Sequence, residues 1–277
     1  MPEGDTVHRI ARVLGAELTG KTLSALALHD RGEVAELAGR TIESVEAVGK
    51  HLLVNFSGDW TLRVHLGMHG GWLRKHVLEP RPRDWTVIIS VGDAAYVCRR
   101  SYRAELLRSS AARTHPRLAR LGPDLLADPP LIDEMVKRAR LLGHAEREIG
   151  DVLLDQRVAS GIGNVYKSEV LFEVRVHPRA KVRELSDAQL TLIFETAARL
   201  MRLNLLTRRR TSVPLRRRDQ PSSERLWVYM RAGKPCSDCG TPVERFLQGD
   251  MARSTYFCPH CQPLGPTCRV GRDRVGD

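Results

Sequence analysis

The sequence lacks several features that would place it in other classes of protein. None of its 277 residues belongs to an apolar run of about 18, so a membrane-spanning helix is excluded. The segment 1–5 carries acids where a secretory signal has positive charge before an apolar stretch, so we expect no export. Hydrophobic residues still make up 42% of the chain, which excludes wholesale disorder and is enough for a sizeable core.

Acidic residues are too few to balance the basic ones. The chain has 44 Lys and Arg against 33 Asp and Glu, a net charge of +11, and its pI is near 9.8. This excess favours a polyanionic partner, with nucleic acid ahead of an anionic membrane surface.

Four of the six cysteines form two closely spaced pairs, Cys236-x2-Cys239 and Cys258-x2-Cys261, separated by eighteen residues. Two such pairs around a hairpin-sized insert are typical of a tetrahedral zinc site. The alternative is two disulfides, which the reducing compartment expected for a chain without an export signal disfavours. The other two cysteines are not expected to be metal ligands. Cys98 fits a small buried hydrophobic residue, and Cys268 fits a residue of the tail without a specific role.

The N-terminal part of the chain combines one helix with many short strands. Apolar residues recur at helical spacing in 6–14, which predicts an amphipathic helix. Short β-branched and apolar runs separated by turn residues then predict strands in a sandwich or a barrel. The expected strands are 41–48, 52–56, 61–66, 86–91 and 95–98.

The C-terminal part is mainly helical. Residues 108–145 contain four prolines among polar residues and read as a connection, with a domain boundary near 125–145. Helices are expected at 149–153, at 165–172 and from a capping box at Ser186 and Gln189 onward. A basic loop (207–225), the zinc hairpin and a disordered tail (264–277) follow.

The start of the chain carries a candidate nucleophile. Removal of Met1, which is usual before a small residue, exposes the secondary amine of Pro2. A free α-amino group has a pKa of about 7.7 to 8.0, so a sizeable fraction of it is neutral at physiological pH and can attack an electrophilic carbon. Glu3 beside it can act as a general acid. The alternative is that Pro2 merely follows the initiator and that Glu3 is an acid favoured by the helix dipole.

A second candidate lies in the turn Gly161-Ile162-Gly163-Asn164. Its two glycines permit close approach of the backbone, and the amides at the start of the next helix can face a phosphate. Asn164 can cap that helix or bind a phosphate oxygen, with Lys167 one turn further on. The alternative is a helical hairpin with glycine in its turn.

Together these motifs resemble the formamidopyrimidine-DNA glycosylase / endonuclease VIII family of base-excision repair enzymes, over residues 2–262, and most of all its bacterial endonuclease VIII-like members. Arg253, five residues before Cys258, also fits the family pattern. The likeness is carried by Pro2-Glu3-Gly4, Gly49-Lys50-His51-Leu52-Leu53, His65-Leu66-Gly67-Met68, the segment 154–169 and the four-cysteine finger.

The resemblance implies an α+β multidomain protein with DNA bound in a cleft between domains. It implies an N-terminal β-sandwich with a flanking helix and a C-terminal helical domain with a helix–two-turn–helix and a zinc-finger hairpin. The expected divisions are a catalytic domain (2–125), a linker (126–145), the helix–two-turn–helix domain (146–230), the finger (231–263) and the tail (264–277).

The resemblance also implies a bifunctional DNA glycosylase and abasic-site lyase, with four catalytic residues. Pro2 would attack C1′ of the damaged nucleotide, and Glu3 would protonate the opening sugar ring. Lys50 would bind phosphate near the lesion and take part in acid–base transfer; its alternative is a surface lysine, although lysines number only seven in this chain. Arg253 would hold the lesion's phosphates bidentately.

Three further residues are matched to DNA binding. Asn164 and Lys167 would contact phosphates, and Met68 would fill the space left by the flipped base, its alternative being a core methionine. One structural Zn²⁺ would fix the finger and aim Arg253. We expect damaged DNA as partner, no small-molecule cofactor, no membrane, a monomer, and a bacterial cytosolic location.

The chain departs from the family pattern in places. Thr6 replaces a second acid, residues 99–103 lack the Arg-Phe-Gly wedge segment, and the cysteine insert is long. The arginine-rich segment 208–218 stands where relatives have a lesion-capping loop, and we expect DNA phosphates to order it.

Gly4 favours the branch that removes oxidised pyrimidines, whereas His65-Leu-Gly-Met68 is more like the oxidised-purine branch. A catalytically silent damage-binding protein and an RNA-associated zinc-ribbon protein are the alternatives from other classes.

Overall fold

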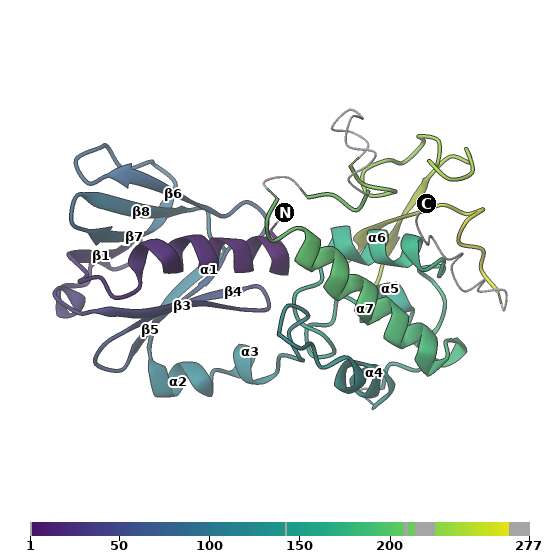
Figure 1. Cartoon of the computed structure of the whole chain (residues 1–277), viewed down its shortest axis with the longest axis horizontal. Coiled ribbons are helices and arrows are strands. Elements are labelled where there is room, and N and C mark those ends of the chain that lie inside the picture. Colours follow the sequence, from purple (N-terminus) through teal and green to yellow (C-terminus); the bar gives the residue numbers. More distant parts are fainter. Residues whose placement is uncertain (1, 142, 208–209, 214–224, 266–277) are drawn as a thin grey trace. The chain divides into compact units, whose positions relative to one another are not determined.

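The computed structural model describes residues 2–141, 143–207, 210–213 and 225–265 (Figure 1). The chain folds as two compact units that divide between Arg120 and Leu121. Most of the predicted basic loop (208–209 and 214–224) and the predicted tail from 266 onward lie outside the described residues. Among the described helices, none has the length and apolar character that crossing a bilayer requires.

The first unit consists of a long helix, strands β1 to β9 and short helical turns. Helix α1 (Gly4–Leu18) opens the unit, and η1 (Ala35–Leu37), α2 (Ser109–Arg113) and α3 (Pro116–Ala119) are the short turns. The strands are β1 (Ala25–Leu28), β2 (Gly32–Glu33), β3 (Ile42–Val48), β4 (His51–Phe56), β5 (Trp60–His65), β6 (Gly71–His76), β7 (Trp85–Val91), β8 (Ala94–Arg99) and β9 (Arg103–Arg108).

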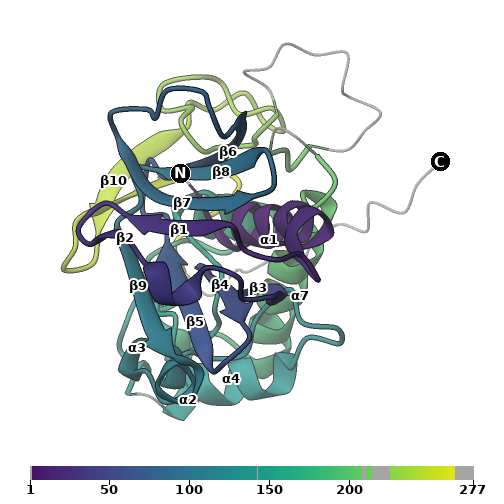
Figure 2. The ribbon, with the colours of Figure 1, turned by 90° about the vertical axis from the view of Figure 1, so that its left-hand side faces the viewer.

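These strands form two antiparallel sheets, ordered β2-β1-β7-β8-β6 and β3-β4-β5-β9. Figure 2 shows the two sheets as separate layers with α1 beside them. Alternate side chains of most strands, such as Leu52 and Val54 of β4 and Leu62 and Val64 of β5, face a shared buried core. The predicted β-sandwich is therefore confirmed, and a closed barrel is not formed.

The flanking helix contributes one apolar stripe to this core. Val7, Ala11, Leu14 and Leu18 are buried at spacings of four, three and four residues, so they lie on one face of α1. The predicted helix at 6–14 is thus found, and it is longer at both ends.

Strands β1, β6 and β9 were not predicted from their sequences. β6 and β9 are edge strands whose side chains are mostly half-exposed or exposed, and both contain several charged residues. β1 has the sequence Ala-Leu-Ala-Leu, without a β-branched or aromatic residue. Pairing with neighbours, rather than local propensity, fixes these strands.

The second unit is helical and ends in a two-stranded hairpin. Its helices are α4 (Ile132–Leu141), α5 (Ile149–Val152), α6 (Asn164–Glu173), η2 (Val182–Glu184) and α7 (Asp187–Leu203), and the hairpin strands are β10 (Glu244–Gln248) and β11 (Arg253–Phe257). The predicted capping box is present, because the Ser186 amide donates to Gln189 Oε1 (2.8 Å) and the Gln189 amide to Ser186 Oγ (3.2 Å).

The segment predicted as a linker, 126–145, contains helix α4. Met135, Val136 and Ala139 of this helix are buried in the core of the second unit, together with side chains of α6 and α7. The prolines before α4 and the charges on its outer face hid this short stripe in the sequence. The segment is therefore a packed part of the second unit.

Candidate active site and zinc centre

Helix α1 and strand β3 run in opposite directions along the first unit. Near one end, the Gly20 amide donates to the Ile42 carbonyl (2.8 Å); further along, a Cβ placed on Gly15 would lie 3.6 Å from the Val45 carbonyl oxygen. From Gly15 back to the start of α1 is about 16 Å, and from Val45 forward to the β3–β4 turn is also about 16 Å. The start of the chain and this turn therefore lie at the same end of the sandwich (Figure 1).

Pro2 and Glu3 stand at the first turn of α1. Pro2 is half-buried, whereas Glu3 has no exposed surface, and the Glu3 carbonyl accepts the amides of Thr6 (3.0 Å) and Val7 (3.1 Å). An acid placed only to favour the helix dipole would sit in solvent, because burying a carboxylate is costly unless it is bound. Complete burial of Glu3 therefore favours a specific role for its carboxyl group.

Lys50 lies in the two-residue turn between β3 and β4. Gly49 has φ +57°, a left-handed conformation that favours glycine, and Lys50 beside it is half-buried. His51, the next residue, pairs across the sheet with His65 of β5. The charge of Lys50 contributes to lowering the pKa of His65, second to desolvation by burial, so Lys50 is close to the end of β5.

Met68 follows β5 directly at this same end. Its side chain is 55% exposed, which contradicts the alternative of a core methionine. Gly67 before it has φ +66°, and a Cβ there would come within 2.7 Å of the Tyr102 Cβ, so the loop is held against the start of β9. The first unit thus brings Pro2, Glu3, Lys50 and the loop of Met68 to one end.

A buried polar cluster on the outer face of sheet β3-β4-β5-β9 was missed by the sequence analysis. Arg63 is 1% exposed; its Nε donates to Glu105 (2.9 Å), and its Nη1 lies 2.9 Å from His51 Nδ1. Burial is the main cause that lowers the pKa of His51 to about 3 and of His65 to about 4, so both are neutral at pH 7. This cluster is only weakly indicated in the sequence, because polar residues at alternate positions of a strand usually face solvent.

In the second unit, the turn between α5 and α6 is shaped by glycine and a glutamine clamp. Gly161 has φ +114°, which favours glycine. Gln156 Oε1 accepts the Gly161 amide, and its Nε2 donates to the Ile162 and Leu154 carbonyls, all at 3.0 Å. Asn164, half-buried, is the first residue of α6 after this turn. The role of Gln156 was not predicted.

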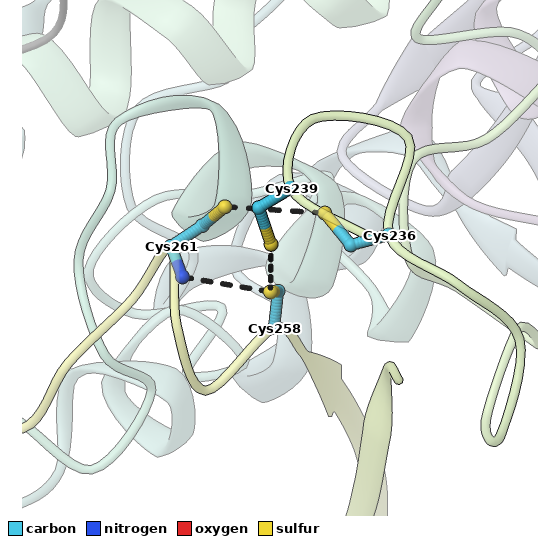
Figure 3. A group of neighbouring side chains, drawn as sticks. All are labelled: Cys236, Cys239, Cys258 and Cys261. Atoms are coloured by element: carbon cyan, nitrogen blue, oxygen red, sulfur yellow. Dashed lines mark hydrogen bonds between the residues drawn. The ribbon is translucent and has the colours of Figure 1, made fainter. Parts of the chain in front are cut away.

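The four predicted cysteines come together at the end of the second unit (Figure 3). Their Sγ atoms all lie within 4.8 Å of one another, with Cys236 and Cys261 at 3.9 Å and Cys239 and Cys258 at 3.5 Å. Tetrahedral Zn–S bonds of about 2.3 Å place sulfurs about 3.8 Å apart, whereas a disulfide needs about 2.05 Å. The donor set fits one structural zinc ion, as predicted, and not two disulfides.

Arg253 is the first residue of β11, directly after the hairpin turn. Its side chain is half-buried, and its Nη2 lies 3.9 Å from Met251 Sδ. Within the part of the chain that the structure describes, Arg253 forms no ion pair. Its guanidinium is therefore available to an external anion.

Lys167 does not stand where a phosphate contact was predicted. It has no exposed surface, and its Nζ donates to Thr255 Oγ1 of β11 at 2.6 Å. The sequence placed Lys167 one turn after Asn164 but gave no sign that β11 covers this face of α6. The expectation that Lys167 touches DNA directly is replaced by a contact inside the second unit.

Asn164 and Arg253 lie at matching ends of two packed elements. Lys167 contacts Thr255, and the next residue of α6, Ser168, accepts the amide of the next residue of β11, Tyr256 (3.2 Å). Further along α6, Phe172 packs with Cys258. β11 therefore runs beside α6 in the same direction. The first residues of both elements are on the same side of the second unit.

Comparison with known proteins agrees with this architecture. Residues 1–104 match the model described as "Formamidopyrimidine-DNA glycosylase N-terminal domain", and residues 121–213 match the "Formamidopyrimidine-DNA glycosylase H2TH domain". The chain is 38% identical to "Probable endonuclease 8 2" of Streptomyces coelicolor, covering 98% of this chain and 97% of the relative. It is 34% identical to "DNA-(apurinic or apyrimidinic site) lyase Nei2" of Mycolicibacterium smegmatis, covering 95% and 99%.

Among solved structures, the fold is similar to Lactococcus lactis Fpg in complex with an abasic site containing DNA. The TM-score is 0.79 with 23% identity, covering 94% of this chain and 99% of the other.

Proposed function

Because the chain belongs to the formamidopyrimidine-DNA glycosylase / endonuclease VIII family and is a bifunctional DNA glycosylase and abasic-site lyase of base-excision repair, we propose that it removes oxidised pyrimidines through a Schiff base on Pro2. The observation that carries the proposal is the fully buried carboxyl group of Glu3 beside Pro2, at the end of the sandwich that also carries Lys50.

The position of Pro2 suits a nucleophilic amine. Once Met1 is removed, the imino group lies just before α1, at the positive end of the helix dipole. A nearby positive potential disfavours protonation, so more of the amine is neutral at physiological pH. Its lone pair attacks C1′, a C1′–N bond forms, and the glycosidic electrons leave with the damaged base, which takes up the proton that the amine loses.

Glu3 supplies the proton that the opening sugar needs. As the bond from C1′ to the ring oxygen breaks, its electrons pass to that oxygen, which Glu3 protonates. The product is an iminium ion between Pro2 and C1′. The carboxyl group of Glu3 is buried beside Pro2, where the sugar ring opens.

The iminium ion also makes strand cleavage possible. It withdraws electrons from C1′ and so acidifies the protons on C2′, and loss of one proton expels the 3′ phosphate by β-elimination. A second elimination, the δ step, removes the sugar from the 5′ phosphate. We assign Lys50 to phosphate binding and proton transfer in these steps, since it stands at the same end of the first unit as Pro2.

The second unit carries the groups that hold the strand. Asn164 at the start of α6 and Arg253 at the start of β11 bind phosphates near the lesion. Zinc, when bound by the four cysteines, fixes the fold of the finger that carries Arg253 and takes no part in the chemistry. Met68, exposed on the first unit, fills the space that the flipped base leaves.

Two features bear on which base is removed. Gly4 after Pro2-Glu3, together with the endonuclease 8 name of a relative, supports oxidised pyrimidines. The His65-Leu66-Gly67-Met68 loop supports oxidised purines as the second candidate, and another relative, 32% identical, is named "Formamidopyrimidine-DNA glycosylase". Duplexes with one lesion each, scored for base release and for the chemistry of the cut ends, distinguish the two.

Borohydride trapping tests the covalent step. Native protein incubated with an abasic-site duplex and borohydride should give a stable adduct, which Pro2→Gly or a retained Met1 abolishes or greatly weakens. Mass spectrometry of active protein should show that Met1 is absent. Binding without an adduct would instead identify a silent damage-binding protein, and tight RNA binding without DNA cleavage a zinc-ribbon protein.

A further inference from the structure

Three consecutive polar residues of helix α6 have no exposed surface: Lys167, Ser168 and Glu169. Successive helix positions point about 100° apart, so three buried neighbours cannot share one face. This turn of α6 is therefore covered on more than one side. Each of the three side chains bonds to the part of the chain that follows α7, and Lys167 and Ser168 bond to β11 itself.

Glu169 secures the segment that leads into the zinc finger. Its carboxylate accepts the backbone amides of Trp227 (2.7 Å), Val228 (2.9 Å) and Tyr229 (2.8 Å). Burial raises the pKa of Glu169, and the three amides oppose that shift because they stabilise the charged form. This contact fixes where the finger starts, but it does not touch the strand that carries Arg253.

Lys167 instead begins a buried chain of hydrogen bonds that reaches the hairpin turn. Lys167 Nζ donates to Thr255 Oγ1 (2.6 Å), and Thr255 Oγ1 donates to Gln248 Oε1 (2.8 Å). Gln248 Nε2 donates in turn to Glu148 Oε2 (2.8 Å) and to the Pro178 carbonyl (2.9 Å). The chain thus connects α6, both strands of the hairpin and the residue before α5.

The hairpin turn also packs very closely against α5. A Cβ on Gly150 would come within 2.4 Å of Gln248 Oε1, and a Cβ on Gly249 within 2.4 Å of Asp151 Oδ1. No larger residue fits at either position without displacement. Gln248 pairs directly with Arg253 across the turn, so the anchored residue is the cross-strand partner of the arginine.

We propose that Lys167 is a positioning residue for Arg253. Through Thr255 and Gln248, it holds Arg253 where this arginine and Asn164 can bind phosphates of the same DNA strand. The inference rests on the proposed function for the phosphate contact, but the coupling itself is a property of the DNA-free protein. Lys167 touches no substrate. The buried amine bonds the hairpin directly to α6, so the hairpin is held in a fixed position relative to the helix–two-turn–helix.

The first experiment needs no DNA. Hydrogen exchange of amides in 244–257 is compared for the zinc-loaded native protein, Lys167→Met and Thr255→Val, with bound zinc measured in each. Both variants should exchange faster in this segment while retaining one zinc, and Thr255→Ser, which keeps the hydroxyl group, should match the native protein. Unchanged exchange in Lys167→Met and Thr255→Val would overturn the proposed coupling.

The second experiment asks whether Lys167 acts through Arg253. Affinity for a duplex with an uncleavable abasic-site analogue is measured against salt concentration. Lys167→Met should weaken binding about tenfold and reduce the salt slope by about 0.9, one phosphate contact. The double variant Lys167→Met/Arg253→Ala should bind no more weakly than Arg253→Ala alone, because both remove the same contact.

Two comparisons keep the outcome decisive. Arg140→Met removes four hydrogen bonds, which run from α4 to the Val182 and Leu185 carbonyls and to Asp187. None of them involves the hairpin, so this variant should leave the salt slope unchanged. Additive losses in the double variant, or an equal change in Arg140→Met, would overturn the positioning role. Native protein that fails to bind or trap abasic DNA would refute the proposed function, while the exchange result still decides the coupling.

Discussion

Burial distinguishes several polar residues of the first unit. Glu3 and the His51–Arg63 pair are enclosed by neighbouring side chains, whereas the sequence around them shows only common residue types. An acid near a chain start and a histidine in a strand are each unremarkable in a sequence. What sets them apart is the loss of water around them, and that depends on the whole fold of the unit.

Glu3→Gln should separate base removal from strand cleavage. Glutamine keeps the shape and cannot donate a proton as an acid, so release of an oxidised base should fall by about 10² or more. On a pre-formed abasic site, where the sugar already opens, cleavage should fall far less. Single-turnover rates on the two substrates measure the difference, with Glu17→Gln on the exposed side of α1 as control. Equal losses on both substrates would contradict the assigned role.

The neutral histidines predict a loss of stability in mild acid. The pKa of His51 (about 3) and of His65 (about 4) lies below the ordinary value of 6.5, so the unfolded chain binds more protons than the folded one between these values. Stability is then complete above pH 6.5 and falls as pH drops toward 4, by up to about 1.4 kcal/mol per pH unit for each histidine. Urea unfolding of His51→Gln and native protein from pH 4.5 to 7.5 should show a shallower slope in the variant.

Parallel pH curves for the two proteins would show that His51 titrates normally in the folded state. His29, which is exposed and has no place in the cluster, provides the matched control as His29→Gln. Its curve should follow that of the native protein.

Among the elements, those with strong local signals were predicted and those fixed by pairing were not. The stripe of α1, the capping box of α7 and the two cysteine pairs are each readable within fewer than about thirty residues. Strand β9 and helix α4 have weak local patterns, and their places depend on partners distant in sequence. The burial of Lys167 was missed for the same reason, because Thr255 lies 88 residues away.

The α5–α6 turn predicts a large effect from a small change. Gly161→Ala places a side chain at φ +114°, which should cost about 1 to 3 kcal/mol and displace Asn164 at the start of α6. We expect lower unfolding stability and weaker binding of abasic-site DNA. Gly71→Ala, at a position where a Cβ meets nothing within 4 Å, is the control and should change neither measurement. Undiminished DNA affinity in Gly161→Ala would show that the turn does not place Asn164.

Loss of zinc should act on the finger and not on the sandwich. Cys258→Ser, or chelation of the metal, removes a ligand that closes a small hairpin with little core of its own. DNA affinity should therefore fall much more than the stability of residues 1–120, followed by hydrogen exchange in the sandwich strands. Exchange that rises throughout both units on zinc removal would show that the finger supports the whole fold.

The charge of the whole molecule and the contacts of the site predict different salt dependences. The net charge of +11 attracts DNA from a distance, but the slope of log K against log salt counts only the phosphates that are neutralised on binding. With about four to six phosphates engaged by groups such as Lys50 and Arg253, a slope of about −4 to −5 is expected. A titration from 50 to 300 mM salt with an abasic-site duplex measures it, and undamaged duplex gives the comparison. A slope near −1 would mean that the named cations do not meet the backbone, and one near −10 that binding is a general property of the basic surface.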